Sequence, residues 1–239
     1  MKRKLPIRIG LGVAAVLAAL QVQAADPVTD AMQAAYVPYR AALFRTNSKA
    51  QLESEQAIAQ AQQAWKALSE RFGAKPPAPY DKDAQFASTL AQVSALYERA
   101  AKEARANQLP EAHETLEQVR DLVAELRKRN EVIVYSDAMN AYHAEMEHIL
   151  TDGTKTLAAP QGQMLLMGQV GALEYLARRL RADAPAALMR DAEFGTHLQA
   201  VEASVAQLRQ AVLGGDAAAV REAISKLKGP YSRMFLKYG

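Results

Sequence analysis

Three of the four histidines in this 239-residue chain lie in two neighbouring stretches, EAHETLEQVR at 111–120 and SDAMNAYHAEMEHIL at 136–150. In each stretch one histidine is followed by a glutamate four residues later, so both side chains lie on one face of a helix. Two imidazoles and two carboxylates from adjacent antiparallel helices form a ligand set that suits zinc, iron or copper(II). We therefore predict a transition-metal site on these two helices. The predicted metal ligands are His113, Glu117, His143 and Glu147.

The second stretch also offers softer ligands. Met139, His143 and Met146 share one helix face at positions i, i+4 and i+7. A thioether sulfur with an imidazole suits copper(I), and a methionine–histidine pair can hold a b-type haem between helices. Methionine at this spacing is also typical of plain core packing. The metal-free alternative is that His113 and His143 are boundary residues, hydrogen-bonded to neighbouring carboxylates.

The remaining polar residues predict no chemistry. We expect His148 and His197 at the surface or at the edge of the buried face. Di-iron bundles carry the Glu-x-x-His motif twice, and this chain has it once, at Glu145 and His148, so the sequence does not match a di-iron site. The sequence contains no glycine-rich phosphate loop, no nucleophile elbow and no Ser/His/Asp arrangement, so we predict that the protein is not an enzyme. We expect one solvated basic edge at a helix end, formed by Arg120, Arg127, Lys128 and Arg129.

The elements that carry these residues are helices. Alanine is abundant, β-branched residues are sparse, and apolar residues recur at three- and four-residue spacing in 109–127 and 190–213. Segments rich in Gly, Pro, Asn and Asp separate the periodic stretches. The predicted fold class is all-α. The eight expected helices span about 28–46, 49–72, 82–106, 110–129, 136–151, 161–182, 188–212 and 215–236.

The eight helices read as four that are repeated. An offset of 107 places TDAMQA at 29–34 against SDAMNA at 136–141. An offset of 108 aligns further matches through three loops, among them Leu68 with Leu176, Arg71 with Arg179, Phe86 with Phe194, Leu90 with Leu198 and Val93 with Val201. We predict a tandem duplication of an up-down four-helix unit, with units at 25–130 and 131–239. The sequence leaves open whether these form separate bundles or one array. Three of the four histidines stand on one pair of helices, at the junction between the repeats.

The first 24 residues predict export. A basic stretch, MKRKLPIR, precedes about twelve apolar residues and a small-residue cleavage site, so we expect signal peptidase to cut after Ala24. The apolar run is too short for a membrane span, which needs about twenty residues, and we expect no stable membrane insertion after cleavage. The leader contributes Lys2, Arg3, Lys4 and Arg8, and without them 25 basic residues face 26 acidic ones, a net charge of about −1. The basic character therefore gives no support to nucleic-acid binding. The chain has no cysteine, which excludes disulfides, thiolate metal sites and c-type haem attachment, and we predict a periplasmic protein.

The run AHETLEQVR followed by SDAMNAYHAEMEHIL resembles a pattern found in exported helical proteins of proteobacteria for which no activity is established. The resemblance covers chiefly residues 35–150, where YRAALFRTN and Trp65 also fit it. It implies compartment and fold only. The architecture is also similar to that of periplasmic cytochrome-type four-helix bundles, although the haem-attachment motif of the c-type members is missing here, and fold alone does not carry function.

From the residues together we predict an exported, non-catalytic protein that binds a transition metal (zinc, iron or copper) at the junction helices. The alternative is a metal-free interaction or scaffold protein with a periplasmic protein partner. A third hypothesis is a b-type haem-binding bundle.

Overall fold

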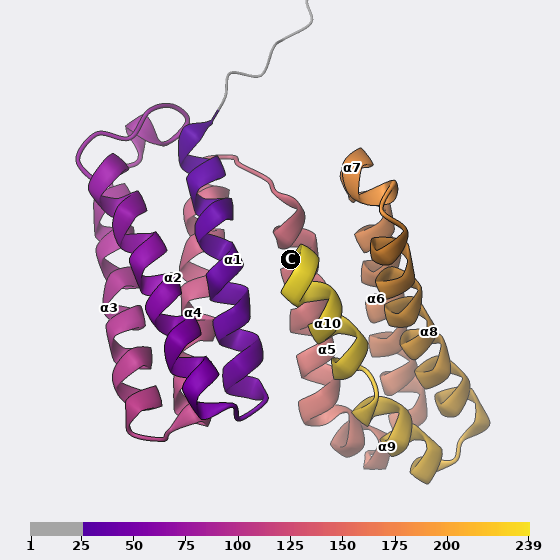
Figure 1. The fold of residues 1–239 in the computed structure, drawn as a ribbon. Helices are drawn as coiled ribbons and strands as arrows, with labels where there is room; N and C mark the ends of the chain where they lie inside the picture. The colour runs from indigo at the N-terminus through magenta and orange to yellow at the C-terminus, as the bar shows by residue number, and fades with distance from the viewer. Residues whose placement is uncertain (1–25) are drawn as a thin grey trace, which may run out of the picture.

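A computed structural model of the chain describes residues 26–239, and the predicted signal peptide at 1–24 lies outside them. The predicted all-α class is confirmed (Figure 1). Within the described residues there is one short 3-10 turn, η1 (Tyr80–Lys82), and the other elements are α-helices. Their bounds are α1 (Pro27–Asn47), α2 (Gln51–Phe72), α3 (Phe86–Arg105), α4 (Leu109–Arg129), α5 (Tyr135–Ala158), α6 (Gly162–Ala182), α7 (Ala186–Met189), α8 (Ala192–Gly214), α9 (Ala217–Ser225) and α10 (Lys228–Tyr238).

The helices pack as two neighbouring sets of antiparallel pairs (Figure 1). In the first set, α1–α4, each helix contacts the next, and α4 returns to α1. In the second set α5 contacts α6, α6 contacts α8, and α9 lies between α8 and α5. Helix α10 contacts α8 and α5 of its own set and α1 of the other. The C-terminal helix therefore forms much of the junction between the sets.

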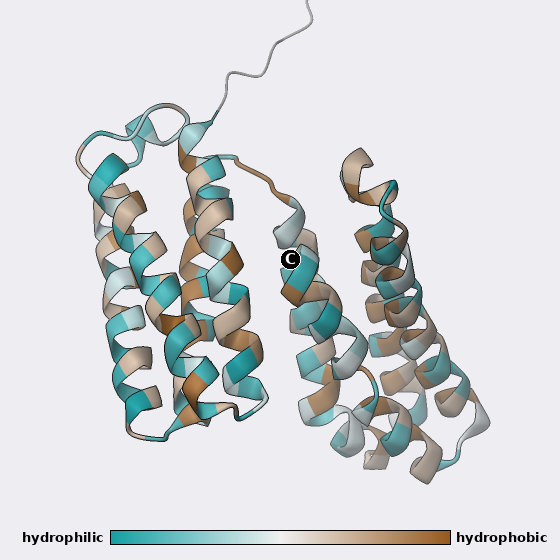
Figure 2. Ribbon diagram, viewed as in Figure 1, coloured by the Kyte–Doolittle hydropathy of each residue, from teal (hydrophilic) through white to brown (hydrophobic). Residues whose placement is uncertain are grey.

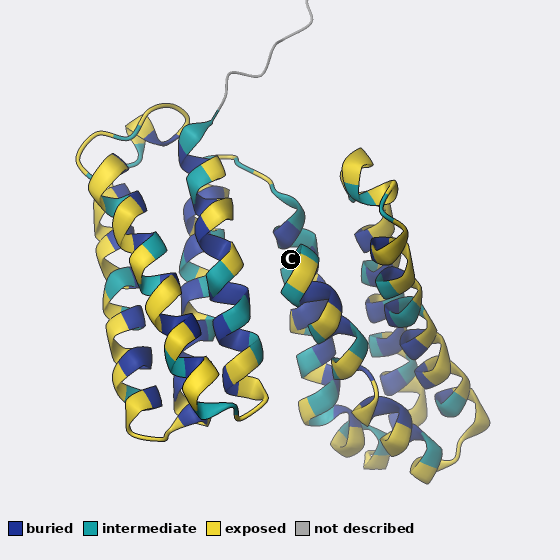
Figure 3. Ribbon diagram, viewed as in Figure 1, coloured by how far each residue is buried: buried dark blue, intermediate teal, exposed yellow. Residues whose placement is uncertain are grey.

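The core follows from the apolar stripes of the sequence. Brown, apolar positions in Figure 2 coincide with the dark blue, buried positions in Figure 3, and both face the interior of each set. In α4 the predicted stripe, including Leu116, Val123 and Leu126, is buried, as is that of α8 from Phe194 to Val212. Tyr39 and Trp65 bring polar atoms into this interior. Each satisfies them by donating to a backbone carbonyl, Tyr39 to Leu116 at 3.0 Å and Trp65 to Leu90 at 3.1 Å.

Helix α5 is longer than predicted, because the expected break at 151–161 begins only after Ala158. Gly153 lies inside the helix without ending it. A Cβ atom built on Gly153 would lie 3.0 Å from Cδ1 of Ile224 on α9, so the position needs a residue without a side chain for close packing. Tertiary packing here outweighs the low helix propensity of glycine.

The predicted helix at 215–236 is wrong in a different way, because it divides into α9 and α10. Pro230 has no N–H to donate to the carbonyl of Lys226, and its ring would collide with that carbonyl in a continuous helix. The predicted start at 82 is also early. The Asp83 side chain accepts from the backbone N–H of Gln85 at 2.9 Å, which holds a turn ahead of α3.

Within residues 26–239, no helix combines the length and the hydropathy that a membrane span requires.

Candidate functional site

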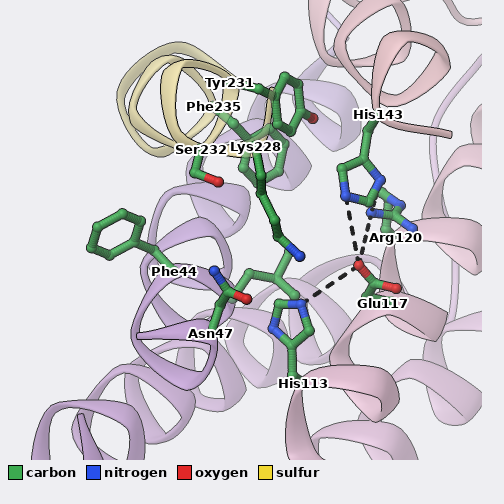
Figure 4. A pocket seen from close by; sticks show the side chains of 11 residues that line it. Phe44, Asn47, His113, Glu117, Arg120, His143, Lys228, Tyr231, Ser232 and Phe235 are labelled. Carbon is green, nitrogen blue, oxygen red and sulfur yellow. Dashed lines mark hydrogen bonds and ion pairs between the residues drawn. The ribbon is translucent and has the colours of Figure 1, made fainter. Parts of the chain in front are cut away.

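The structure brings the four predicted ligands together. His113 and Glu117 lie on α4, and His143 and Glu147 lie on α5. Oε1 of Glu117 lies 3.7 Å from Nε2 of His113 and 3.7 Å from Nε2 of His143 (Figure 4). Oε1 of Glu147 lies 3.5 Å from the same nitrogen of His143. The two His-x-x-x-Glu pairs therefore lie next to one another, and their role as metal ligands stays a prediction.

Two basic side chains share this cluster. Nη1 of Arg120 lies 2.9 Å from Nδ1 of His143 and 3.6 Å from Oε1 of Glu117. Nζ of Lys228, on α10, lies 3.0 Å from Oε1 of Glu147. Because a guanidinium only donates, Nδ1 of His143 must accept, and the proton of the neutral ring is then on Nε2, which faces the two carboxylates. Both ring nitrogens of His143 are thus engaged by protein groups.

The environment shifts the pKa of two members of the cluster. Burial lowers the pKa of His113 and outweighs the carboxylate of Glu117, which raises it; the positive charge of Lys228 lowers it further. A hydrogen bond from His143 lowers the pKa of Glu147 to about 2, with help from Lys228 and against the effect of burial. Nδ1 of His113 lies 3.0 Å from the hydroxyl of Thr46, and this contact holds the ring against α1. At neutral pH His113 is therefore uncharged and Glu147 is ionised.

A small, partly open pocket with a cavity volume of about 40 Å³ lies over this cluster (Figure 4). Its walls come from α1, α4, α5 and α10, so both helix sets contribute. One side is polar and carries the cluster. The other is apolar and aromatic, formed by Leu43, Phe44, Tyr231 and Phe235, and Asn47 and Ser232 also line the pocket. An apolar wall that faces a few polar groups is the usual composition of a small-molecule site.

Residues 26–239 contain no group of three or more His, Asp or Glu side chains placed to hold a metal ion. The nitrogen–oxygen distances of 3.5 and 3.7 Å are those of ion pairs, and a metal needs its ligands around one point at about 2.0–2.2 Å from the ion. Met139 and Met146, proposed for copper(I), are completely buried in the core. The arrangement, as it stands, is a network of hydrogen bonds and ion pairs.

The expectation of a solvated basic edge is wrong for two of its members. Arg120 lies in the pocket, and the side chain of Arg127 is 4% exposed, paired with Asp137 across the turn into α5. The carboxylate of Asp137 also accepts from the backbone N–H of Val134 at 3.0 Å. Lys128 is solvated as predicted. His148 is exposed and His197 half-buried beside Glu193, in agreement with their expected surface or boundary positions.

Sequence reasoning missed Lys228, Asn47, Ser232 and, in this role, Arg120. Arg120 was detectable, because it stands seven residues after His113 and therefore on the same helix face. Lys228 had no local indication, since only the packing of α10 against the first set brings it to the pocket. Phe235, which lines the pocket, also packs against an aromatic residue from the other end of the described chain, with the rings of Tyr36 and Phe235 6.2 Å apart.

No protein-family model, no curated protein and no solved structure matches this chain. The family resemblance drawn from the sequence therefore stays a prediction. The function has to be argued from the site itself.

Proposed function

We propose that this protein is an exported, non-catalytic binding protein that holds a small ligand in the pocket between its two helix sets. The observation that carries the proposal is the pocket itself. Ionisable side chains from α4, α5 and α10 converge on one side, and aromatic rings from α1 and α10 face them. The side chains of Glu117 and Lys228 are 31% and 36% exposed, so a ligand can reach them from solvent. Sites with an apolar wall and a few converging polar groups are the usual form of small-molecule pockets.

The proposal includes the tandem duplication, with units at 25–130 and 131–239. Two helix starts support it, because α1 and α5 begin 108 residues apart at Pro27 and Tyr135, and so do α4 and α9, at Leu109 and Ala217. In this account duplication preserved the core and left the junction as the place where a site could evolve. His113 and His143 occur on α4 and α5, and the equivalent positions of the other helices carry no histidine, so one pocket serves the whole chain.

Native mass spectrometry of the protein exported by a native-like host, purified without a His tag, tests the proposal. We expect the native mass to exceed the denatured mass by that of one small molecule. A Ser232→Trp variant should lose this difference, because the larger side chain enters the pocket from α10. The same denatured mass reports whether cleavage follows Ala24, and fractionation reports the periplasmic location. Equal native and denatured masses for the unaltered protein would contradict the proposal.

Transition-metal binding is the second candidate, favoured by the convergence of His113, Glu117, His143 and Glu147. To bind zinc, iron or copper, the four side chains must close around one point and release Arg120 and Lys228. Elemental analysis of the same preparation tests this. Near-stoichiometric metal that is lost in His113→Ala and His143→Ala would favour this candidate over the small-molecule proposal. A metal-free protein whose thermal stability does not rise with added ions would reject it.

A further inference from the structure

We propose that the ligand of the junction pocket is a small organic carboxylate with an apolar or aromatic body. This inference rests on the proposed function and specifies its ligand class. It follows from the charges, the exposure and the walls of the pocket.

The accessible donor in the pocket is Lys228. Arg120 is 13% exposed and is already held by His143 and Glu117. Lys228 is 36% exposed, and Glu147 engages only one side of its ammonium group, which has three protons. Figure 4 shows the Lys228 side chain reaching into the pocket, where Asn47 and Ser232 add further polar groups. A carboxylate placed here gains a charge-assisted hydrogen bond without displacing an existing ion pair.

The carboxylates of the pocket, by contrast, already face basic side chains of the protein. Glu117 lies within 3.7 Å of His113, His143 and Arg120. Glu147 is contacted by His143 and Lys228. A ligand ammonium group approaching Glu117 would meet the guanidinium of Arg120, which lies 3.6 Å from that carboxylate, and like charges at such distances repel. The cluster therefore selects an anion over a cation.

The opposite wall defines the rest of the ligand. The rings of Tyr231 and Phe235 stack with centroids 5.7 Å apart, and Phe44 is half-buried beside them at the entrance. Leu43 completes an apolar surface with no charged side chain. A flat apolar group packs on such a surface, whereas a free inorganic anion would leave it uncovered.

Fluorine NMR titrations with three matched probes test the inference on the purified full-length exported protein. The probes are para-fluorophenylacetate, the neutral para-fluorophenylacetamide and the cationic para-fluorophenethylammonium ion. At neutral pH we expect the carboxylate to bind at least about tenfold more tightly than either other probe, because only its charge complements the ammonium group of Lys228. Equal affinities, or preference for the ammonium probe, would overturn the inference.

Two lysines form a matched pair for the control. Lys228→Gln should weaken binding of the carboxylate about tenfold and leave binding of the amide unchanged, because one charged hydrogen bond is lost. Lys226→Gln should change nothing, since Lys226 pairs with Glu222 at the surface and does not line the pocket. Phe44→Ala should weaken all three probes alike. If no probe binds while native mass spectrometry finds an occupied pocket, the ligand class is wrong and the proposed function stands.

Discussion

The ion pair between Arg127 and Asp137 joins the end of α4 to the start of α5, where the chain passes from the first helix set to the second. Its contribution to the free energy of unfolding can be predicted. Arg127 is near the end of α4, and Asp137 is in the first turn of α5. Among the residues that the structure describes, this is the only buried ion pair that connects these two helix ends. The side chains are 4% and 29% exposed. Asp137→Asn removes the negative charge and keeps the shape, including an oxygen that can accept from Val134. Arg127 is then a buried cation without a counter-charge.

The expected cost follows from the burial of the pair. Breaking a fully buried ion pair by removing one partner costs about 3–5 kcal/mol. Because water reaches Asp137, part of this cost is recovered, and we expect Asp137→Asn to lower the free energy of unfolding by about 2 kcal/mol. For a chain of this length the melting temperature should fall by about 4–8 °C.

Urea unfolding followed by circular dichroism measures the effect, in a double-mutant cycle with Arg127→Met. The double variant should be more stable than Asp137→Asn alone, because neither charge is then left unpaired. Glu125→Gln is the matched control. Its partner Lys128 is exposed and 3.5 Å away, so we expect a change within about 0.5 kcal/mol. If Asp137→Asn behaved like this control and the cycle showed no coupling, the pair would not stabilise the junction.

Three further outcomes follow from the same structure. Glu147→Gln should be less stable than the unaltered protein at neutral pH. The folded-state pKa of Glu147 is about 2, below its usual 4.5, so this difference in stability should disappear as the pH falls from 4.5 to about 2. Thermal melts across this pH range measure it. Because the pKa of His113 is lowered in the folded protein, the unfolded chain binds a proton at this histidine at a higher pH than the folded protein does. The free energy of unfolding should therefore fall as the pH drops below about 6.5, and His113→Gln should reduce this loss. Equal pH profiles for the variant and the unaltered protein would contradict this prediction. Gly153→Val should lower the free energy of unfolding by about 1–3 kcal/mol, because the new side chain would crowd Ile224. Gly195→Ala on α8 should raise it by up to about 1 kcal/mol in the same urea assay, because the added methyl group meets open space and alanine favours a helix.

Much of the fold could be predicted because helical periodicity is local. The stripes of α4 and α8 fix which faces are buried, and Asp191 and Asp216 mark helix starts by accepting from backbone N–H groups two residues ahead. The errors fall where a distant segment decides. Gly153 stays helical because α9 packs closely against it, and that contact has no trace in the residues around Gly153.

The candidate site likewise has a part that local spacing predicts and a part that only tertiary packing reveals. Spacing alone placed His113 with Glu117 and His143 with Glu147, and the antiparallel helices bring the pairs together as expected. Spacing could not reveal Lys228, whose side chain reaches the cluster from the C-terminal helix. The site predicted from α4 and α5 alone therefore lacked the lysine that α10 contributes. This cation is the main reason why we propose an organic anion, and not a metal ion, as the ligand.

The most direct test of the central claim is an isotope-filtered NOE experiment on the protein with bound para-fluorophenylacetate. The account predicts NOEs from the probe's ring protons to Phe44, Tyr231 and Phe235, and their loss in Ser232→Trp. NOEs confined to the exposed apolar residues Met164, Leu165 and Leu213, with none to the pocket, would contradict it.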